Sequence, residues 1–371
     1  MADKKRYGLL EMDEETKKRL DKEIRKQPFH RPTGEELKAM LKEKRKGLPR
    51  PIDVHCHPYT KTGWKSLGRF RPHLEKYLYN KENVTAETIT AEAPTDEEWV
   101  QVYRELGVAT TPVGWDAETT MGLRPPYGPD ELYQSNTNDY MASLRDRFPD
   151  VVIAAWGSVD PWKGKKALEE AERAIKKLKL IGLKFQQTGQ AFMISDRQFY
   201  PLWDLLQEME APVQFHTGYT GLGGGAPGGL GVKLKYTMNV IPDFDDVAAD
   251  FPKLKMILLH PAEGRDEDAV LVCRHKGNCY RELSGMWPEY MPINVPKTWY
   301  ELNRRQQDKY MFGSEFNLFP LSGILYQQYQ LDYREGILEK LLWKNTIRIL
   351  GPELERSGVN LKEWRINLAE V

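Results

Sequence analysis

Two histidines separated by a single residue are the most chemically informative feature of this sequence. They are His55 and His57, in the stretch PIDVHCHPY at residues 51–59, directly after fifty mostly charged residues. Side chains alternate along a strand, so the two imidazoles share one face and can supply two nitrogen ligands to a divalent metal. His216 and His260 end two later apolar runs, and Glu315 follows another. Together these residues predict a metal site.

The elements that must position them are short apolar runs alternating with amphipathic helices. Helices are expected at 96–106, 165–179, 196–210, 244–251 and 266–275, the second burying Leu168, Ala171, Ile175 and Leu178. Nearly continuous apolar strands alternating with helices are typical of a parallel sheet covered by helices. The expected strands are 51–55, 107–113, 151–157, 181–186, 212–216, 254–260, 278–283 and 309–314.

Eight such units are the number that closes into a (β/α)8 TIM barrel, and the span of about 300 residues suits that fold. A doubly wound open sheet is the competing topology, but it normally has a glycine-rich turn after its first strand, and PIDVHCHPY lacks one. Active sites of barrels lie at the carboxyl ends of the strands. His55, His57, His216, His260 and Glu315 all fall at or just past such ends.

The composition of the chain excludes several classes of protein. Lys+Arg and Asp+Glu both number 54, so the chain lacks the basic footprint of a nucleic-acid-binding protein. No window approaches the apolar length of a membrane span, and three cysteines are too few for a disulfide framework. A cytoplasmic enzyme acting on a small molecule is expected. Residues 1–50 are predicted as a helical extension, with helices near 13–26 and 34–45, and residues 51–371 as the catalytic domain.

Four motifs in order resemble the amidohydrolase superfamily, in particular its branch that resembles aminocarboxymuconate-semialdehyde decarboxylase: PIDVHCH, PVQFHTG, MILLHPAEG and MFGSE. The resemblance covers about residues 50–352. It implies that His55, His57 and His216 bind a divalent metal, with zinc the first choice and manganese the second. It also implies that Glu315 ligates the metal or acts as base, and that His260 contacts substrate or transfers a proton. Relatives carry Asp where this chain has Glu315.

The same resemblance implies an activity. We expect a hydrolase in which a metal-activated water attacks a carbonyl of a small aromatic or keto-acid-like substrate, including cleavage of a carbon–carbon bond. The alternatives are a non-oxidative decarboxylase and a barrel that binds ligand without turnover. Lys184, Tyr219 and Trp287 are candidate substrate contacts, and a homodimer is expected from the resemblance alone. The run GLGGGAPGG at 221–229 is interpreted as a flexible loop, because Pro227 interrupts a dinucleotide-binding pattern.

Overall fold

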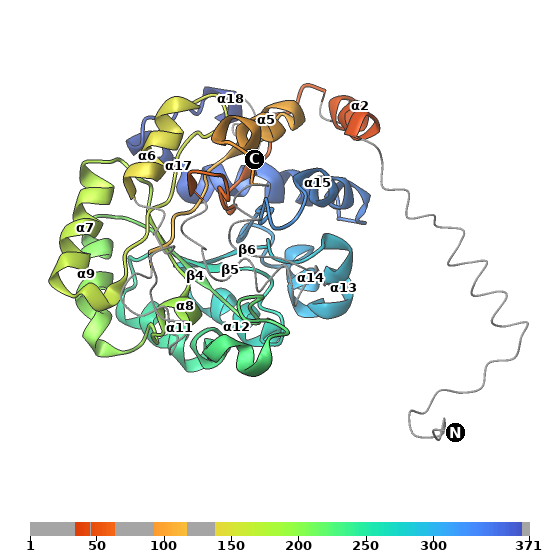
Figure 1. The fold of residues 1–371 in the computed structure, drawn as a ribbon. Coiled ribbons are helices and arrows are strands. Elements are labelled where there is room, and N and C mark those ends of the chain that lie inside the picture. Colours follow the sequence, from red (N-terminus) through yellow and green to blue (C-terminus); the bar gives the residue numbers. More distant parts are fainter. Residues whose placement is uncertain (1–33, 45, 64–92, 117–137, 366–371) are drawn as a thin grey trace, which may run out of the picture.

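The structure is a computed structural model that describes residues 34–44, 46–63, 93–116 and 138–365. Its short parallel strands lie at the centre, and helices surround them (Figure 1). The strands are β1 (Ile52–Asp53), β2 (Ala109–Thr110), β3 (Leu183–Phe185), β4 (Val213–His216), β5 (Met256–Leu259), β6 (Cys279–Glu282) and β7 (Tyr310–Met311). β1 pairs with β2, and β3 to β7 pair in sequence order.

Backbone hydrogen bonds join these two groups of strands into a ring. Thr110 bridges Val152 on one side of the segment 151–157, and Gly157 bridges Leu183 of β3 on the other. At the other seam the Val54 N–H donates to the Phe312 carbonyl at 3.0 Å. The predicted (β/α)8 barrel is therefore confirmed.

The third predicted strand, 151–157, differs from expectation because it forms isolated bridges rather than a continuous ladder. Its neighbour on the β2 side contains Pro112, whose carbonyl accepts from the Trp156 N–H at 2.9 Å. Proline has no N–H to return, so the ladder is interrupted there. The other predicted strands are shorter than expected but occur at the predicted places.

The helices of the barrel follow the strands along the chain. Helix α5 (Asp96–Leu106) is preceded by the N-cap Thr95, whose hydroxyl accepts from the Glu98 N–H in a capping box, and it is followed by Gly107 in a left-handed conformation. The longer helices are α2 (Gly34–Lys44), α5 (Asp96–Leu106), α6 (Asn138–Arg147), α7 (Lys165–Lys176), α9 (Tyr200–Glu208), α11 (Val240–Asp250), α12 (Asp266–His275), α14 (Pro296–Leu302), α15 (Leu321–Gln330) and α17 (Asn345–Arg356). The short ones are α8 (Gln187–Gln190), α10 (Lys235–Met238), α13 (Met291–Asn294), α16 (Ile337–Glu339) and α18 (Lys362–Arg365).

The helices bury the faces that the sequence pattern predicts, with local shifts. In α7, Ala171 and Ile175 are buried as expected, whereas Leu168 is only half-buried. Leu178 lies beyond the end of α7 and is also half-buried. α2 lies outside the ring of barrel helices and contacts α5 and α15, with Leu37 buried against them (Figure 1). The helix predicted at 13–26 lies outside the described residues.

No helix among the described residues is both long and apolar enough to cross a lipid bilayer.

Candidate metal centre

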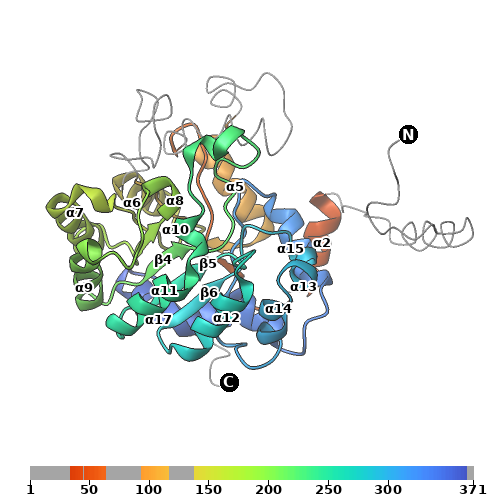
Figure 2. The same cartoon turned by 90° about the horizontal axis from the view of Figure 1, so that it is seen from below.

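A cavity of about 320 Å³ opens at the carboxyl ends of the strands. The segments that follow β1 and β4 lie at this same end of the barrel (Figure 2). The five residues that the sequence singled out as ligands or catalysts all line the cavity, as does Lys184. The remaining lining residues are Tyr59, Trp115, Gln186, Tyr219, Thr220, Gly221, Leu222, Pro261, Glu263, Gly285, Met286, Leu318 and Phe319.

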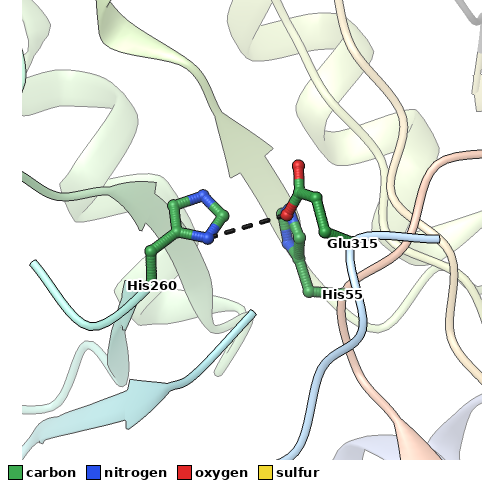
Figure 3. Close-up of side chains that lie close together, drawn as sticks. All are labelled: His55, His260 and Glu315. Atoms are coloured by element: carbon green, nitrogen blue, oxygen red, sulfur yellow. Dashed lines mark ion pairs between the residues drawn. The ribbon is translucent and has the colours of Figure 1, made fainter. Parts of the chain in front are cut away.

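The Glu315 carboxylate lies at the centre of the cluster. Its Oε2 is 3.3 Å from Nε2 of His55 and 3.6 Å from Nδ1 of His260, and its Oε1 is 3.2 Å from Nε2 of His57. His55, His260 and Glu315 point toward one another from different strands (Figure 3), and one candidate ligand atom from each lies within 4.8 Å of the others. The first and last strands thus bring imidazole and carboxylate together.

His55 presents a nitrogen that has no hydrogen-bond partner among the residues that the structure describes. Its Nδ1 lies 3.2 Å from Oε1 of Gln214, and an amide oxygen only accepts, so the proton is on Nδ1. In the neutral ring Nε2 is then the unprotonated nitrogen, and it is buried 3.3 Å from Oε2 of Glu315. An orphaned buried nitrogen beside a carboxylate is what a cation between them would satisfy. The donor set therefore fits a divalent metal ion.

His216 also lies beside His260. The rings of His216 and His260 have centroids 4.3 Å apart, and those of His55 and His260 are 5.1 Å apart. Nε2 of His216 donates to the Tyr219 carbonyl at 3.0 Å, which leaves Nδ1 with the lone pair. Four histidines from three strands thus surround the site, and metal ligation by His57 and His216 stays a prediction.

His260 is held by a pair of residues that the sequence reasoning missed. Its Nδ1 lies 3.1 Å from the Ser284 carbonyl and 3.0 Å from the Ser284 hydroxyl. That hydroxyl is also 2.8 Å from Glu282 and 3.0 Å from Glu315. The carbonyl only accepts, so Nδ1 of His260 carries the proton and Nε2 has the lone pair. Ser284 therefore fixes the tautomer of His260.

Electrostatics leave the cluster ready for a cation at neutral pH. Burial lowers the pKa of His57 and His216 to about 4, and it holds the pKa of His260 well below its usual range. Burial opposes ionisation of Glu315, but His55 and His260 outweigh it and hold the pKa of Glu315 well below its usual range. Burial likewise opposes the charge on His55, yet Glu315 raises its pKa overall. Most imidazoles are thus neutral and the carboxylate ionised, the states that metal binding needs.

A buried hydrogen-bond network fixes the backbone on both sides of the site. The Asp53 carboxylate accepts from the Tyr103 hydroxyl at 2.8 Å, from the Ser314 N–H at 3.0 Å and from the His55 N–H at 3.2 Å. Burial raises its pKa to about 6 despite these bonds. The adjoining Glu315 has a φ of 59°, a left-handed conformation that is uncommon for a non-glycine residue. Such backbone clusters at functional sites, where surrounding contacts enforce it.

Gly313 is required just after β7, where the chain passes the buried Glu282. A Cβ at position 313 would lie 1.9 Å from Oε1 of Glu282 and 3.1 Å from Cβ of His55. We expect Gly313→Ala to lower the free energy of unfolding by about 1–3 kcal/mol and to weaken metal binding, because neither neighbour has room to move. Urea unfolding and metal titration measure the two effects. Gly277→Ala is the control, since its Cβ would meet nothing within 4 Å; equal effects of the two variants would contradict the prediction.

The three predicted substrate contacts have different surroundings. Lys184 is buried in the cavity wall, and Tyr219 lines the opening with 45% of its surface exposed. Trp287 is not part of the described lining. Its ring packs against Phe319, which does line the cavity, with centroids 5.6 Å apart. Trp287 therefore packs against a residue of the wall and does not itself line the cavity.

Comparisons with solved structures show the same fold. The structure matches 5-carboxyvanillate decarboxylase from Sphingomonas paucimobilis with a TM-score of 0.57 at 15% identity, covering 81% of this chain and 99% of that one. The enzyme of that name from Novosphingobium aromaticivorans, with manganese and 4-hydroxy-3-methoxy-5-nitrobenzoic acid, matches with a TM-score of 0.58 at 14% identity, covering 82% and 96%. A probable 2-pyrone-4,6-dicarboxylic acid hydrolase from Acinetobacter baumannii, with citric acid bound, gives 0.53 at 12% identity, covering 81% and 99%.

No curated protein matches the chain in sequence. A family model described as amidohydrolase matches residues 52–351, which include every strand of the barrel and all five residues of the cluster. Enzymes of this family use a divalent metal for hydrolysis or decarboxylation. The chain therefore belongs to the amidohydrolase family.

Proposed function

We propose that this protein is a metal-dependent hydrolase that adds water to a carbonyl group of a small, planar substrate. The observation that carries the proposal is the convergence of one carboxylate on three imidazoles: Glu315 lies 3.2–3.6 Å from His55, His57 and His260. Imidazole nitrogens with a carboxylate oxygen are the ligands that zinc prefers, and manganese is the second candidate.

His55, His57 and His216, with Glu315, would hold the ion. A bound divalent ion would supply Lewis acidity, which acidifies water and polarises a carbonyl. Glu315 is ionised and in reach of the same space, so it accepts the proton that the attacking water loses. His260 presents Nε2 and transfers that proton to the leaving group, while Ser284 keeps Nδ1 protonated.

The walls of the cavity bind and orient the substrate. Tyr59, Trp115 and Phe319 present aromatic surface, and Leu222, Met286 and Leu318 present apolar surface. Such walls favour a flat, largely apolar body and exclude bulk water from the reacting groups. These walls suit an aromatic acid equally well, so non-oxidative decarboxylation is the second candidate. Two of the similar structures are named as decarboxylases of 5-carboxyvanillate.

Isotope labelling distinguishes the two reactions. The zinc- and manganese-loaded proteins are incubated with aromatic acids, β-keto acids, aryl ketones and lactones in water enriched in ¹⁸O or deuterium. Hydrolysis places one ¹⁸O in a new carboxylate, whereas decarboxylation releases carbon dioxide and places one deuterium on carbon. We expect ¹⁸O incorporation that depends on the metal. Absence of turnover with both metals across the panel would contradict an enzymatic role.

A further inference from the structure

The Thr220 hydroxyl is a buried donor in the cavity wall that has no acceptor among the described residues. Thr220 lines the cavity with only 3% of its surface exposed. Its Oγ1 accepts from the Leu222 N–H at 3.2 Å and from Nε2 of Gln186 at 3.1 Å. A hydroxyl oxygen has two lone pairs, so both are occupied and the proton takes the remaining direction. Toward a ligand in the cavity this side chain can therefore act only as a donor.

The amide of Gln186 is oriented by its own partners and supplies a second donor. Its Oε1 accepts from the Gly189 N–H at 3.1 Å and from the Thr188 hydroxyl. A backbone N–H only donates, so the amide atom that faces Gly189 is the oxygen and the one that faces Thr220 is the nitrogen. One proton of this nitrogen goes to Thr220, and the other has no acceptor among the residues that the structure describes. Gln186 also lines the cavity, which places two donor atoms 3.1 Å apart in one part of its wall.

These two donors select for one kind of ligand atom. A buried donor without an acceptor costs free energy, which a ligand oxygen in this part of the cavity would recover. Neither side chain can accept in return, because Oγ1 of Thr220 and Oε1 of Gln186 each already have two donors. An ammonium or other donor group is therefore rejected. Both donors and their described partners are uncharged, so a carbonyl or ether oxygen matches them without burying a further charge.

We propose that Thr220 and Gln186 form a recognition site for an uncharged acceptor oxygen of the substrate, a carbonyl or ether oxygen, apart from the group that reacts at the histidine cluster. Thr220 is the specificity-determining residue of the pair, because its only remaining hydrogen-bonding capacity is the proton that it offers to the ligand. The bond from the Leu222 N–H also fixes the start of the glycine-rich run 221–229 beside this site. The inference rests on the proposed function only for the position of the reacting group.

Binding of matched probe pairs tests the proposal. The metal-loaded full-length protein is titrated calorimetrically with the ortho, meta and para isomers of acetylbenzoate and of isopropenylbenzoate, in which a carbon–carbon double bond replaces the ketone carbonyl. We expect at least one acetylbenzoate to bind about fivefold or more tightly than its isopropenyl counterpart. In Thr220→Val that preference should fall to within about twofold, whereas Thr220→Ser keeps the hydroxyl and should keep the preference. Thr346→Val is the matched control, because Thr346 is equally buried and its hydroxyl has no described partner, but it does not line the cavity.

The ratio of the two affinities separates recognition from a structural role. A purely structural loss in Thr220→Val would weaken both probes of a pair equally and leave their ratio unchanged. The proposal is overturned if the wild type prefers no acetylbenzoate, or if Thr220→Val keeps the preference. Should Thr220→Val fail to fold, Thr220→Ala replaces it under the same two criteria. A wild type that holds no metal would count against the proposed function instead, since the affinity ratio is measured as heat and needs no turnover.

Discussion

Glu315→Gln should abolish most of the turnover and weaken metal binding, the largest effect that we expect of any single substitution. The glutamine keeps the length of the side chain but removes the negative charge that faces three histidines. Its amide nitrogen would also point a donor at imidazoles or at the Ser284 hydroxyl, where an acceptor is needed. We expect kcat/KM to fall about 10³- to 10⁴-fold through loss of the base. Metal affinity should fall at least about tenfold.

Competition with a coloured chelator measures the affinity, and kcat is then measured at saturating metal so that the two losses are separated. Glu263→Gln is the matched control, because Glu263 lines the same cavity but is exposed and outside the cluster. It should change kcat/KM by less than about threefold. If Glu315→Gln retained both metal and turnover, the carboxylate would be neither ligand nor base.

The fold was predictable because both the alternation of side chains along strands and the periodicity of helices can be read from the sequence. Alternation along PIDVHCH predicts that His55 and His57 face the centre while Cys56 faces outward, and Cys56 does pack in the core with its sulfur against the Thr110 hydroxyl. The helix expected at 266–275 has the same bounds in the structure. The gathering of residues at the strand ends followed from the fold rather than from any local signal.

The groups that orient the histidines of the site could not be predicted in the same way. Glu282 and Ser284 lie on β6 and just after it, and nothing in NCYRELSG indicates which neighbours they meet. Their roles depend on the stagger between strands, which brings the Ser284 hydroxyl between two carboxylates and His260. The same holds for the Tyr219 carbonyl that orients His216, since a backbone oxygen has no sequence signature. The only available clue was that Ser284 is a polar residue two positions after the end of β6.

His260→Asn should reduce turnover strongly while leaving the metal in place, which separates proton transfer from ligation. His260 has a φ of 67°, and asparagine tolerates this left-handed conformation better than most residues, so the backbone should be retained. Nδ1 of His260 donates to the Ser284 carbonyl, so Nε2 is the nitrogen that transfers the proton. Loss of the ring removes this nitrogen. We expect kcat to fall about 10²- to 10⁴-fold. Metal affinity should change by less than about threefold, because His55, His57, His216 and Glu315 remain.

Two further variants sharpen this result. Ser284→Ala removes the hydroxyl but keeps the backbone carbonyl that holds Nδ1, so kcat should fall only about tenfold. His275→Asn changes an exposed histidine at the end of α12 and should leave both kcat and metal affinity unaltered. One candidate ligand atom of His260 lies within 4.8 Å of those of His55 and Glu315. A loss of metal in His260→Asn would therefore identify His260 as a metal ligand. The proton would then have to be transferred by Glu315 alone, and Ser284→Ala would weaken metal binding instead of turnover.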